Sequence, residues 1–333
     1  MNTLSDSTSA RRTATRLGLA LIVFIGIEIA LSHALTYIFH VQFQSELLGY
    51  IVPYASVYVV GFILFLLITR PVKRSSIPKE KWGFWHLVCA MAASYAGGYI
   101  CNLAYSLINT LVTGASAVTM TTTSFSSLVD VNPIFSFILM TIVVPVVEEF
   151  VFRKTLIGCT RKYGEKIAII FSSAMFALFH MNLQQLFYAF AIGLVFGYVY
   201  SKTGNLVYTI IFHSINNMLG YFASFALNGL AEAMGASGLS DLSSALSSSS
   251  GTLTSMSTIL PWLILEYTVS GIAYALVIIG IIHFFRKIIK VRFTKDAPNQ
   301  LTHAAPLYLN VGVILFGIMC LVMLVFRQVT GTM

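Results

Sequence analysis

Charged residues are scarce in this sequence, and their scarcity excludes several classes of protein. Asp, Glu, Lys and Arg make up 10% of the 333 residues, whereas soluble domains carry about 25%. Hydrophobic residues make up 57% and are concentrated in long runs. A soluble enzyme, a disordered chain and a nucleic-acid reader are therefore excluded, and the sequence predicts an integral membrane protein.

The cysteine patterns that bind metals or form disulfide frameworks are also missing. The chain has four cysteines, none of them in a CxxC pair, and each lies in or beside an apolar run. Neither a disulfide framework nor a thiolate metal site is therefore indicated. The net charge of +8 comes from basic residues in short loops, which is typical of a membrane orientation signal rather than of nucleic-acid binding.

Apolar runs of about 20 residues predict helices that cross the bilayer, because every backbone polar group must be hydrogen-bonded within its own segment. Nine runs qualify, at 17–39, 49–69, 86–112, 133–157, 167–182, 183–201, 205–227, 259–285 and 306–326. The predicted fold class is therefore all-α, a polytopic transmembrane helix bundle of eight or nine spans.

Lys and Arg are absent from three predicted loops, 40–48, 113–132 and 228–258. Short loops that carry Lys and Arg tend to stay in the cytoplasm, so these three are expected outside, and the N-terminus, with three arginines before its first span, inside. The run 17–39 exceeds the 7 to 15 or so apolar residues of a signal peptide, which predicts an uncleaved anchor. A multi-pass protein of the cell membrane is expected.

Ionisable residues within the apolar runs are candidates for function, because a charge in the bilayer costs at least ~2.5 kcal/mol. The candidates are Glu28, His33, Glu148, Glu149, Arg153, His180, His213 and Glu266. Three of them, Glu28, His33 and Glu266, stand apart from the others, and each is expected either to line a cavity or to hydrogen-bond to a neighbouring helix.

The densest group lies on the fourth predicted span. Glu149 and Arg153 are four residues apart, so a helix places them on one face in the order that favours an ion pair. Glu148 is rotated by about 100° from that face and is free to face a cavity as a general base. The alternative is that both acids lie at the inner end of the span and meet lipid headgroups.

Two further groups lie on later spans. His180 ends the short fifth span, and His213 and Asn217 are four residues apart on the seventh, so a helix points both toward one place. The alternative for His180 is an interfacial or packing role, and for the other two a hydrogen bond between helices.

Depth in the bilayer indicates whether these groups can meet. Counted at about 1.5 Å per residue from the nearest basic residue of the inner side, Glu148 lies about 20 Å deep and His180 about 21 Å. The same count places His213 and Asn217 at about 16 and 22 Å. The four side chains are therefore expected in one buried layer.

A carboxylate, two imidazoles and a carboxamide in one layer are suited to activating water. Glu148 can take a proton from water, while a histidine and the Asn217 amide stabilise the oxyanion that forms on a carbonyl. The same layer offers His180, His213 and Glu148 as ligands of Zn²⁺, with one position open to water. The chain has no HExxH pair, so different helices would have to supply those ligands.

The chain resembles the CPBP family of intramembrane proteases in three motifs on successive spans, Glu148-Glu149-xxx-Arg153, Phe176-xxx-His180 and His213-xxx-Asn217. That family includes the CAAX prenyl-endopeptidases and the bacterial Abi-type bacteriocin self-immunity proteins. The resemblance covers about residues 140–220. Within it, the stretch from Gly193 to Leu206 is similar to the family's linking span, and its GxxxG sequence predicts close helix packing.

The resemblance implies a membrane-embedded endopeptidase in which Glu148 activates water while Glu149 and Arg153 organise the site. The side chains that it implies for binding the water and stabilising the tetrahedral intermediate are His180, His213 and Asn217. Family members have been described both as metalloproteases and as metal-free glutamate proteases, so bound zinc and a metal-free mechanism both stay open.

The domain organisation follows from these assignments. Residues 1–333 are expected to form a single integral membrane domain, with 133–227 as its catalytic core. The outer loop 228–258 is rich in Ser and has no strong periodicity, which predicts a mobile segment.

Two other functions compete with the protease hypothesis. One is a non-catalytic bacteriocin-immunity or partner-binding membrane protein that keeps the polar layer for packing. The other is an ion-coupled transporter that uses Glu28, Glu148 and Glu266 as proton sites. For a protease, the expected partners are the lipid bilayer and a membrane-associated protein or peptide substrate: a prenylated C-terminus, a bacteriocin-related peptide or an anchored regulator. The sequence indicates neither the oligomeric state nor which of these substrates is used.

Overall fold

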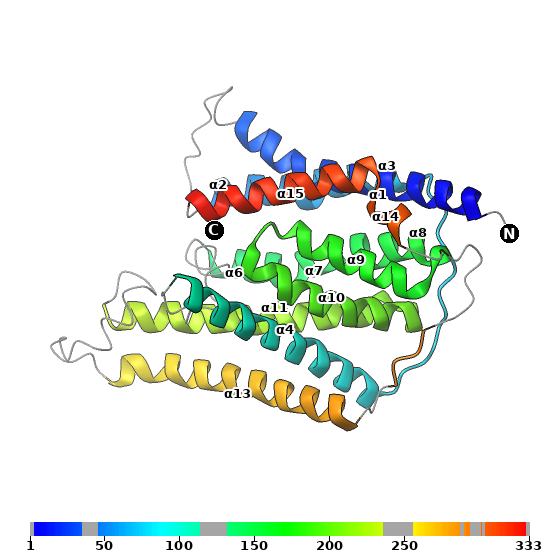
Figure 1. Ribbon diagram of the computed structural model, residues 1–333. Coiled ribbons are helices and arrows are strands. Elements are labelled where there is room, and N and C mark those ends of the chain that lie inside the picture. Colours follow the sequence, from blue (N-terminus) through cyan, green and yellow to red (C-terminus); the bar gives the residue numbers. More distant parts are fainter. Residues whose placement is uncertain are drawn as a thin grey trace.

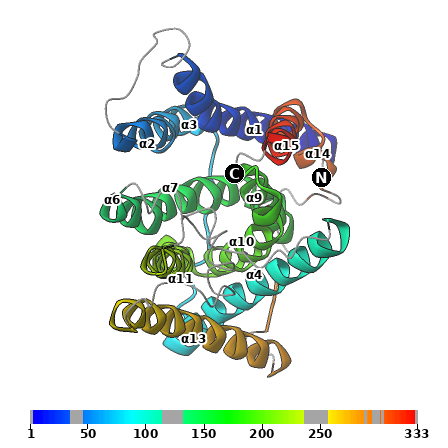
Figure 2. The same cartoon turned by 90° about the vertical axis from the view of Figure 1, so that its left-hand side faces the viewer.

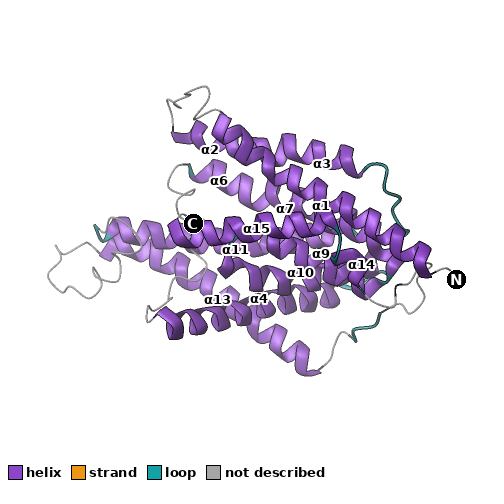
Figure 3. Ribbon diagram, turned by 45° about the horizontal axis from the view of Figure 1, so that its top comes forward, coloured by secondary structure: helices purple, strands orange, loops and turns teal. Residues whose placement is uncertain are grey.

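The computed structural model of the protein describes residues 3–34, 46–113, 132–235, 256–286, 290–293, 301 and 304–330. Within these ranges every regular element is a helix and none is a strand (Figures 1 and 3). The predicted all-α fold class is confirmed. The side chains of Glu28 and His33 lie outside the described part of the chain.

The helical elements, in chain order, are α1 (Thr3–His33), α2 (Glu46–Ala55), η2 (Ser56–Gly61), α3 (Phe62–Thr69), α4 (Phe84–Thr113), α6 (Pro133–Ile138), η3 (Leu139–Val143), α7 (Val144–Glu149), η4 (Phe150–Ile157), α8 (Gly158–Thr160), η5 (Arg161–Tyr163), α9 (Glu165–Phe179), α10 (Leu183–Thr203), α11 (Leu206–Ala233), α13 (Met256–Arg286), α14 (Ala305–Tyr308) and α15 (Val311–Thr330). Elements η2, η3 and η4 are π-helical.

Each of the nine apolar runs predicted from the sequence contains helix in the part that the structure describes. Among the described residues, five helices are long and apolar enough to cross a membrane, namely Ile51–Thr69, Phe84–Val112, Pro133–Tyr163, Leu183–Thr203 and Ser257–Arg286. The others fall short in length or apolarity. For example, the 15 residues of α9 extend about 22 Å, less than the ~30 Å of a hydrocarbon core.

The bundle has three tiers (Figure 2). Helix α1 packs against η2, α3, α14 and α15 in one outer tier. The central tier holds the continuous helical segment from α6 to η5 and the hairpin of α9 and α10. In the third tier α13 packs against both α4 and α11, while α11 also contacts η3 and α7. The central tier therefore has helices on both sides.

Helix α11 is longer than the sequence predicted. The predicted loop 228–258 begins inside α11, which continues to Ala233, and ends inside α13, which starts at Met256. Leu230 is buried against Trp262 of α13, and this packing keeps the end of α11 helical. Residues 236–255 lie outside the described residues, so their mobility stays a prediction.

Short turns join α9 to α10 and α10 to α11. The side chain of Asn182 accepts a hydrogen bond from the backbone N–H of Gln185 (3.1 Å) and so caps α10. Asn205 caps α11 in the same way, through the N–H of Val207 (3.0 Å). Between them Gly204 ends α10 with a φ of 60°, a left-handed conformation that glycine adopts without steric cost.

The two glycines of the GxxxG sequence bring α10 close to its neighbours. A Cβ atom at Gly193 would lie 3.1 Å from Cβ of Ser173 on α9, and one at Gly197 would lie 3.1 Å from Cγ2 of Ile169 on the same helix. The close packing predicted for this sequence is therefore present, and its partner is α9.

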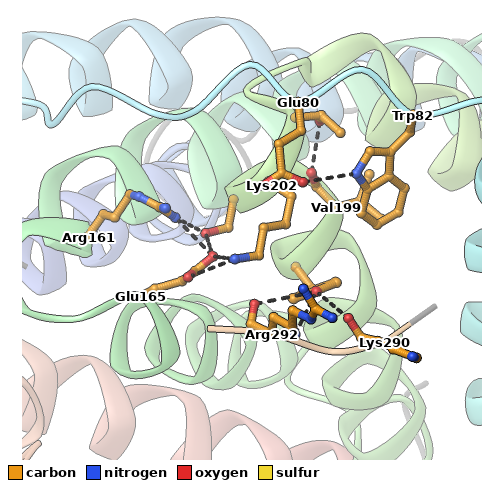
Figure 4. Close-up of polar contacts among 11 residues, drawn as sticks. Glu80, Trp82, Arg161, Glu165, Val199, Lys202, Lys290 and Arg292 are labelled. Carbon is orange, nitrogen blue, oxygen red and sulfur yellow. Dashed lines mark hydrogen bonds and ion pairs between the residues drawn. The ribbon is translucent and has the colours of Figure 1, made fainter. Parts of the chain in front are cut away.

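Buried charged residues join α9 to α10 at the end of the hairpin that lies away from its turn (Figure 4). The carboxylate of Glu165 lies 3.3 Å from the guanidinium of Arg161 and 3.0 Å from Nζ of Lys202. The hydroxyl of Ser201 donates to Glu165 (2.9 Å) and also contacts Arg161. The extended chain after α3 joins this end, because the backbone N–H of Glu80 donates to the carbonyl of Lys202 (3.1 Å).

Candidate active site

The two adjacent glutamates lie on α7, a short α-helical segment between two π-helices, η3 and η4. Pro145 is the second residue of α7 and has no N–H to donate to the preceding turn, which accounts for a local change in helix geometry. π-helical turns within longer helices are common at functional sites. Glu148 and Glu149 are both buried.

Glu149 forms the predicted ion pair with Arg153. Oε2 of Glu149 lies 3.1 Å from Nε of Arg153, and neither side chain has any exposed surface. The guanidinium also lies over the ring of Phe176, 4.5 Å from its centroid, and 5.6 Å from that of Phe196. Its nitrogens make no hydrogen bond within the described residues. The carboxylate and the two rings are therefore the contacts that stabilise this buried cation.

His213 of α11 lies between the two glutamates. Its Nδ1 is 3.1 Å from Oε1 of Glu149, and its Nε2 is 3.8 Å from Oε2 of Glu148. Phe176 packs edge to face against the imidazole, with ring centroids 5.7 Å apart. Because the ionised Glu149 can only accept a hydrogen bond, Nδ1 of His213 is the donor and Nε2 faces Glu148.

Glu148 has a partner that the sequence did not predict. The hydroxyl of Tyr58, on η2, donates to Oε1 of Glu148 at 3.0 Å. The second oxygen, Oε2, is buried and makes no hydrogen bond among the described residues. Tyr58 is one of 16 tyrosines and lies inside an apolar run, so neither charge nor spacing distinguished it.

His180 caps the C-terminal end of α9 and faces the same region. Its Nδ1 lies 2.8 Å from the carbonyl oxygen of Phe176, and the two rings meet edge to face with centroids 4.8 Å apart. Glu148, His213 and Arg153 all contribute to the electrostatic environment of His180. The motif residue Phe176 thus contacts Arg153, His180 and His213.

Asn217 lies one turn beyond His213 but is held by a different partner. Its Nδ2 donates to the carbonyl of Met140, in η3, at 2.8 Å. This contact joins α11 to the π-helix that precedes the glutamates. The role expected of Asn217 toward an oxyanion stays a prediction.

Glu266, of the remaining ionisable candidates, makes its contact within its own helix. Its carboxylate accepts a hydrogen bond from Ser270 (2.8 Å), one turn further along α13. This differs from the hydrogen bond to another helix that the sequence suggested.

The side chains proposed as zinc ligands were His180, His213 and Glu148. Both imidazoles have Nδ1 engaged, one by a backbone carbonyl and one by a carboxylate, as is usual for histidines that bind metals. However, among the described residues no three His, Cys, Asp or Glu side chains are close enough together to hold a metal ion. The donor types suit zinc but their arrangement does not, so the chemistry below is derived from the side chains alone.

Comparisons with known proteins agree with the motifs. Residues 130–219 match the family model described as type II CAAX prenyl endopeptidase Rce1-like. The membrane-embedded CAAX protease MroQ of Staphylococcus aureus (strain USA300) is 30% identical over 135 residues, which are 38% of this chain and 53% of that protein. The chain thus aligns with about half the length of this curated relative. No solved structure matches. Residues 130–219 hold all three motifs, and their match confirms the resemblance to the CPBP family of intramembrane proteases.

Proposed function

We propose that the protein is an intramembrane endopeptidase in which Glu148 activates water for attack on a peptide bond. One observation carries the proposal: Oε2 of Glu148 and Nε2 of His213 are 3.8 Å apart. This separation is too long for a hydrogen bond, but a single water oxygen can lie about 2.8 Å from both atoms. Oε2 of Glu148 is buried and makes no hydrogen bond within the part of the chain that the structure describes, so it can accept a hydrogen bond from this water.

The contacts around His213 fix its orientation. Glu149 accepts from Nδ1, and Arg153 holds Glu149 in place. In the neutral ring the proton is therefore on Nδ1, and Nε2 presents a lone pair toward the proposed water position. A water molecule there donates one hydrogen to Glu148 and the other to His213, which leaves an oxygen lone pair free for attack.

In the proposed reaction Glu148 takes one proton from water and later gives it to the leaving amine. Water transfers a proton to Oε2 of Glu148 as its oxygen forms a bond to the peptide carbonyl carbon. The oxyanion of the tetrahedral intermediate is stabilised by donors from His180 and Asn217. When the carbon–nitrogen bond breaks, Glu148 returns its proton to the leaving amine and is ionised again.

Donation by His180 requires a charged ring. Its Nδ1 hydrogen bonds to the Phe176 carbonyl, so only the imidazolium has a second N–H, on Nε2, for an oxyanion.

The substrate class to test first is a prenylated peptide. The matched family description and the name of the bacterial relative both refer to CAAX processing. We therefore propose a membrane-associated protein or peptide with a prenylated C-terminus as the substrate.

The test uses the full-length protein in liposomes and an internally quenched farnesylated peptide ending in a CAAX sequence, with its unfarnesylated counterpart. We expect the wild type to cleave the farnesylated peptide and Glu148→Gln, which keeps side-chain volume, to be inactive. Cleavage that survives Glu148→Gln would overturn the proposed mechanism and favour a packing role for the polar layer. Preferential cleavage of the unfarnesylated peptide would overturn the substrate class. Retained activity with a chelator agrees with the mechanism, whereas stoichiometric zinc that is needed for cleavage would contradict it.

A further inference from the structure

Tyr58 reaches the proposed active site from outside the region that matches the protease family. It lies on η2 (Ser56–Gly61), whereas the family match begins at residue 130. Its hydroxyl lies 3.0 Å from Oε1 of Glu148. The next two residues, Val59 and Val60, are exposed on the bundle surface, so Tyr58 is on the face of η2 that turns inward.

The local sequence explains why the helix changes geometry here. Pro53 lies inside α2 and cannot donate a backbone hydrogen bond to the preceding turn. Its own carbonyl accepts the hydroxyl of Ser56 at 2.6 Å, and the π-helical turns begin at that serine. A π-helix has more than 3.6 residues per turn, so it shifts the direction of later side chains relative to a regular α-helix.

Packing then holds the Tyr58 ring in place. Phe24 of α1 meets it edge to face, with centroids 6.3 Å apart, and Tyr54 stacks on it at 6.3 Å. Helix α1 can approach η2 closely because Gly61 lies against the backbone of Phe24. The phenol is thus fixed by two neighbouring rings before it contacts the glutamate.

We propose that Tyr58 is a positioning residue for Glu148, an inference that rests on the proposed function. The hydrogen bond to Oε1 fixes the rotation of the carboxylate and leaves Oε2 facing Nε2 of His213. Without the hydroxyl, the carboxylate can rotate and bond directly to the imidazole when that ring is protonated. A charge-assisted bond of that kind would take the place of the reactive water.

This inference also makes the active site composite. Glu148 and His213 come from the segment 130–219 that resembles the family, but the group that sets the orientation of Glu148 comes from η2. The α1 and η2 pair is then part of the catalytic unit.

The test compares Tyr58→Phe with Tyr221→Phe in liposomes, using the farnesylated peptide. Tyr221 is the control because its hydroxyl likewise donates a hydrogen bond inside the bundle, to the backbone carbonyl of Pro133 at 2.7 Å; Tyr221 is buried and Tyr58 is partly buried. We expect Tyr58→Phe to lower kcat by roughly 10- to 100-fold, as for the loss of a hydrogen bond to a charged group, with KM unchanged. A purely structural role would instead lower the amount of folded protein.

Two isosteres separate the hydrogen bond from packing. At position 58, 4-aminophenylalanine keeps an N–H donor and 4-methylphenylalanine fills the same volume without one. We expect only the first to restore kcat. Equal kcat values for the two isosteres would overturn the proposal, even if Tyr58→Phe itself does not fold.

The outcomes also distinguish this inference from the proposed function. If the wild type cleaves, Glu148→Gln does not and Tyr58→Phe keeps the wild-type kcat, the positioning role is wrong and the endopeptidase stands. If Glu148→Gln cleaves as fast as the wild type, the proposed function fails and the role of Tyr58 fails with it.

Discussion

Nδ1 of His213 lies 3.1 Å from Oε1 of Glu149, and both side chains are buried. Glu149 therefore serves two partners, since its other oxygen pairs with Arg153 at 3.1 Å. Within the described residues no arginine contacts Glu148 this closely, and Glu148 accepts its hydrogen bond from a neutral phenol. Glu149 is thus paired with Arg153 and His213, whereas Glu148 is hydrogen-bonded to Tyr58.

Glu149→Gln should destabilise the protein far more than Glu148→Gln. The first substitution removes the carboxylate that pairs with the buried Arg153, and breaking a buried ion pair typically costs about 3–5 kcal/mol. Glu148, by contrast, forms no ion pair with a Lys or Arg within the described residues. Thermal unfolding in detergent checks this order. Both variants should lose peptide cleavage, and equal unfolding temperatures would show that Glu149 does not stabilise Arg153.

Phe176→Leu should lower both stability and activity. The ring lies under the guanidinium of Arg153 and against both imidazoles, of His180 and His213. Loss of a desolvated cation–π contact costs about 2 kcal/mol, apart from the change in packing. The matched control is Phe187→Leu, because Phe187 is half exposed on the bundle surface. Unfolding temperature and kcat should fall for Phe176→Leu only. Similar losses in the two variants would show that the contact between Arg153 and Phe176 does not stabilise the site.

The parts of the site that sequence spacing predicted are local. Glu149 and Arg153 are one helical turn apart, so the helix alone brings them together, and the ion pair is present. The contact between Glu149 and His213 joins residues 64 positions apart and depends on how α11 packs against α7. The depth count placed Glu148 and His213 in one layer, but it did not show that His213 would hydrogen-bond to Glu149.

Tyr58 and Glu165 were not predicted because ordinary sequence patterns conceal them. Tyr58 lies in an apolar run where aromatic residues are expected. Glu165 lies among basic residues after the fourth span, where charges usually meet solvent, yet it is buried between Arg161 and Lys202. A distant helix supplies the partner of Tyr58 and one of the two partners of Glu165, Lys202. The helices that the structure describes within the nine apolar runs, by contrast, followed from those runs alone, because that signal is contained in each segment.

Asn217→Ala should destabilise the site more than Asn216→Ala does. Asn217 donates to the carbonyl of Met140 in η3, on another helix, whereas Asn216 donates to Phe212 within α11. Removing the first amide leaves a buried acceptor without its partner, at a cost of about 1–3 kcal/mol. Thermal unfolding measures the stability difference. Asn217→Asp provides the control for polarity, since a carboxylate cannot donate to the carbonyl and should be no better than alanine.

Gly193→Val should separate α9 from α10 and reduce cleavage. Its Cβ would lie 3.1 Å from Cβ of Ser173, which is tighter than ordinary contact, whereas a Cβ at Gly271 on α13 meets nothing within 4 Å. Overpacking of this kind costs about 1–3 kcal/mol, and it displaces α9, the helix that His180 directly follows. Gly271→Val is the matched control for helix propensity. Comparable unfolding temperatures for the two variants would show that α9 and α10 tolerate the added volume.

Glu165→Gln should destabilise the hairpin of α9 and α10 without changing catalysis at temperatures where the protein stays folded. Glu165 is the shared partner of Arg161 and Lys202, both buried, and its loss leaves two cations close together, at a cost of about 3–5 kcal/mol. Lys202→Met should cost less, because the pair of Arg161 and Glu165 remains. Glu165 begins α9 and His180 follows its last residue, about 22 Å away along the helix, so kcat measured well below the unfolding transition should match the wild type. Greater destabilisation by Lys202→Met than by Glu165→Gln would mean that the cations, rather than the shared carboxylate, hold this end of the hairpin together.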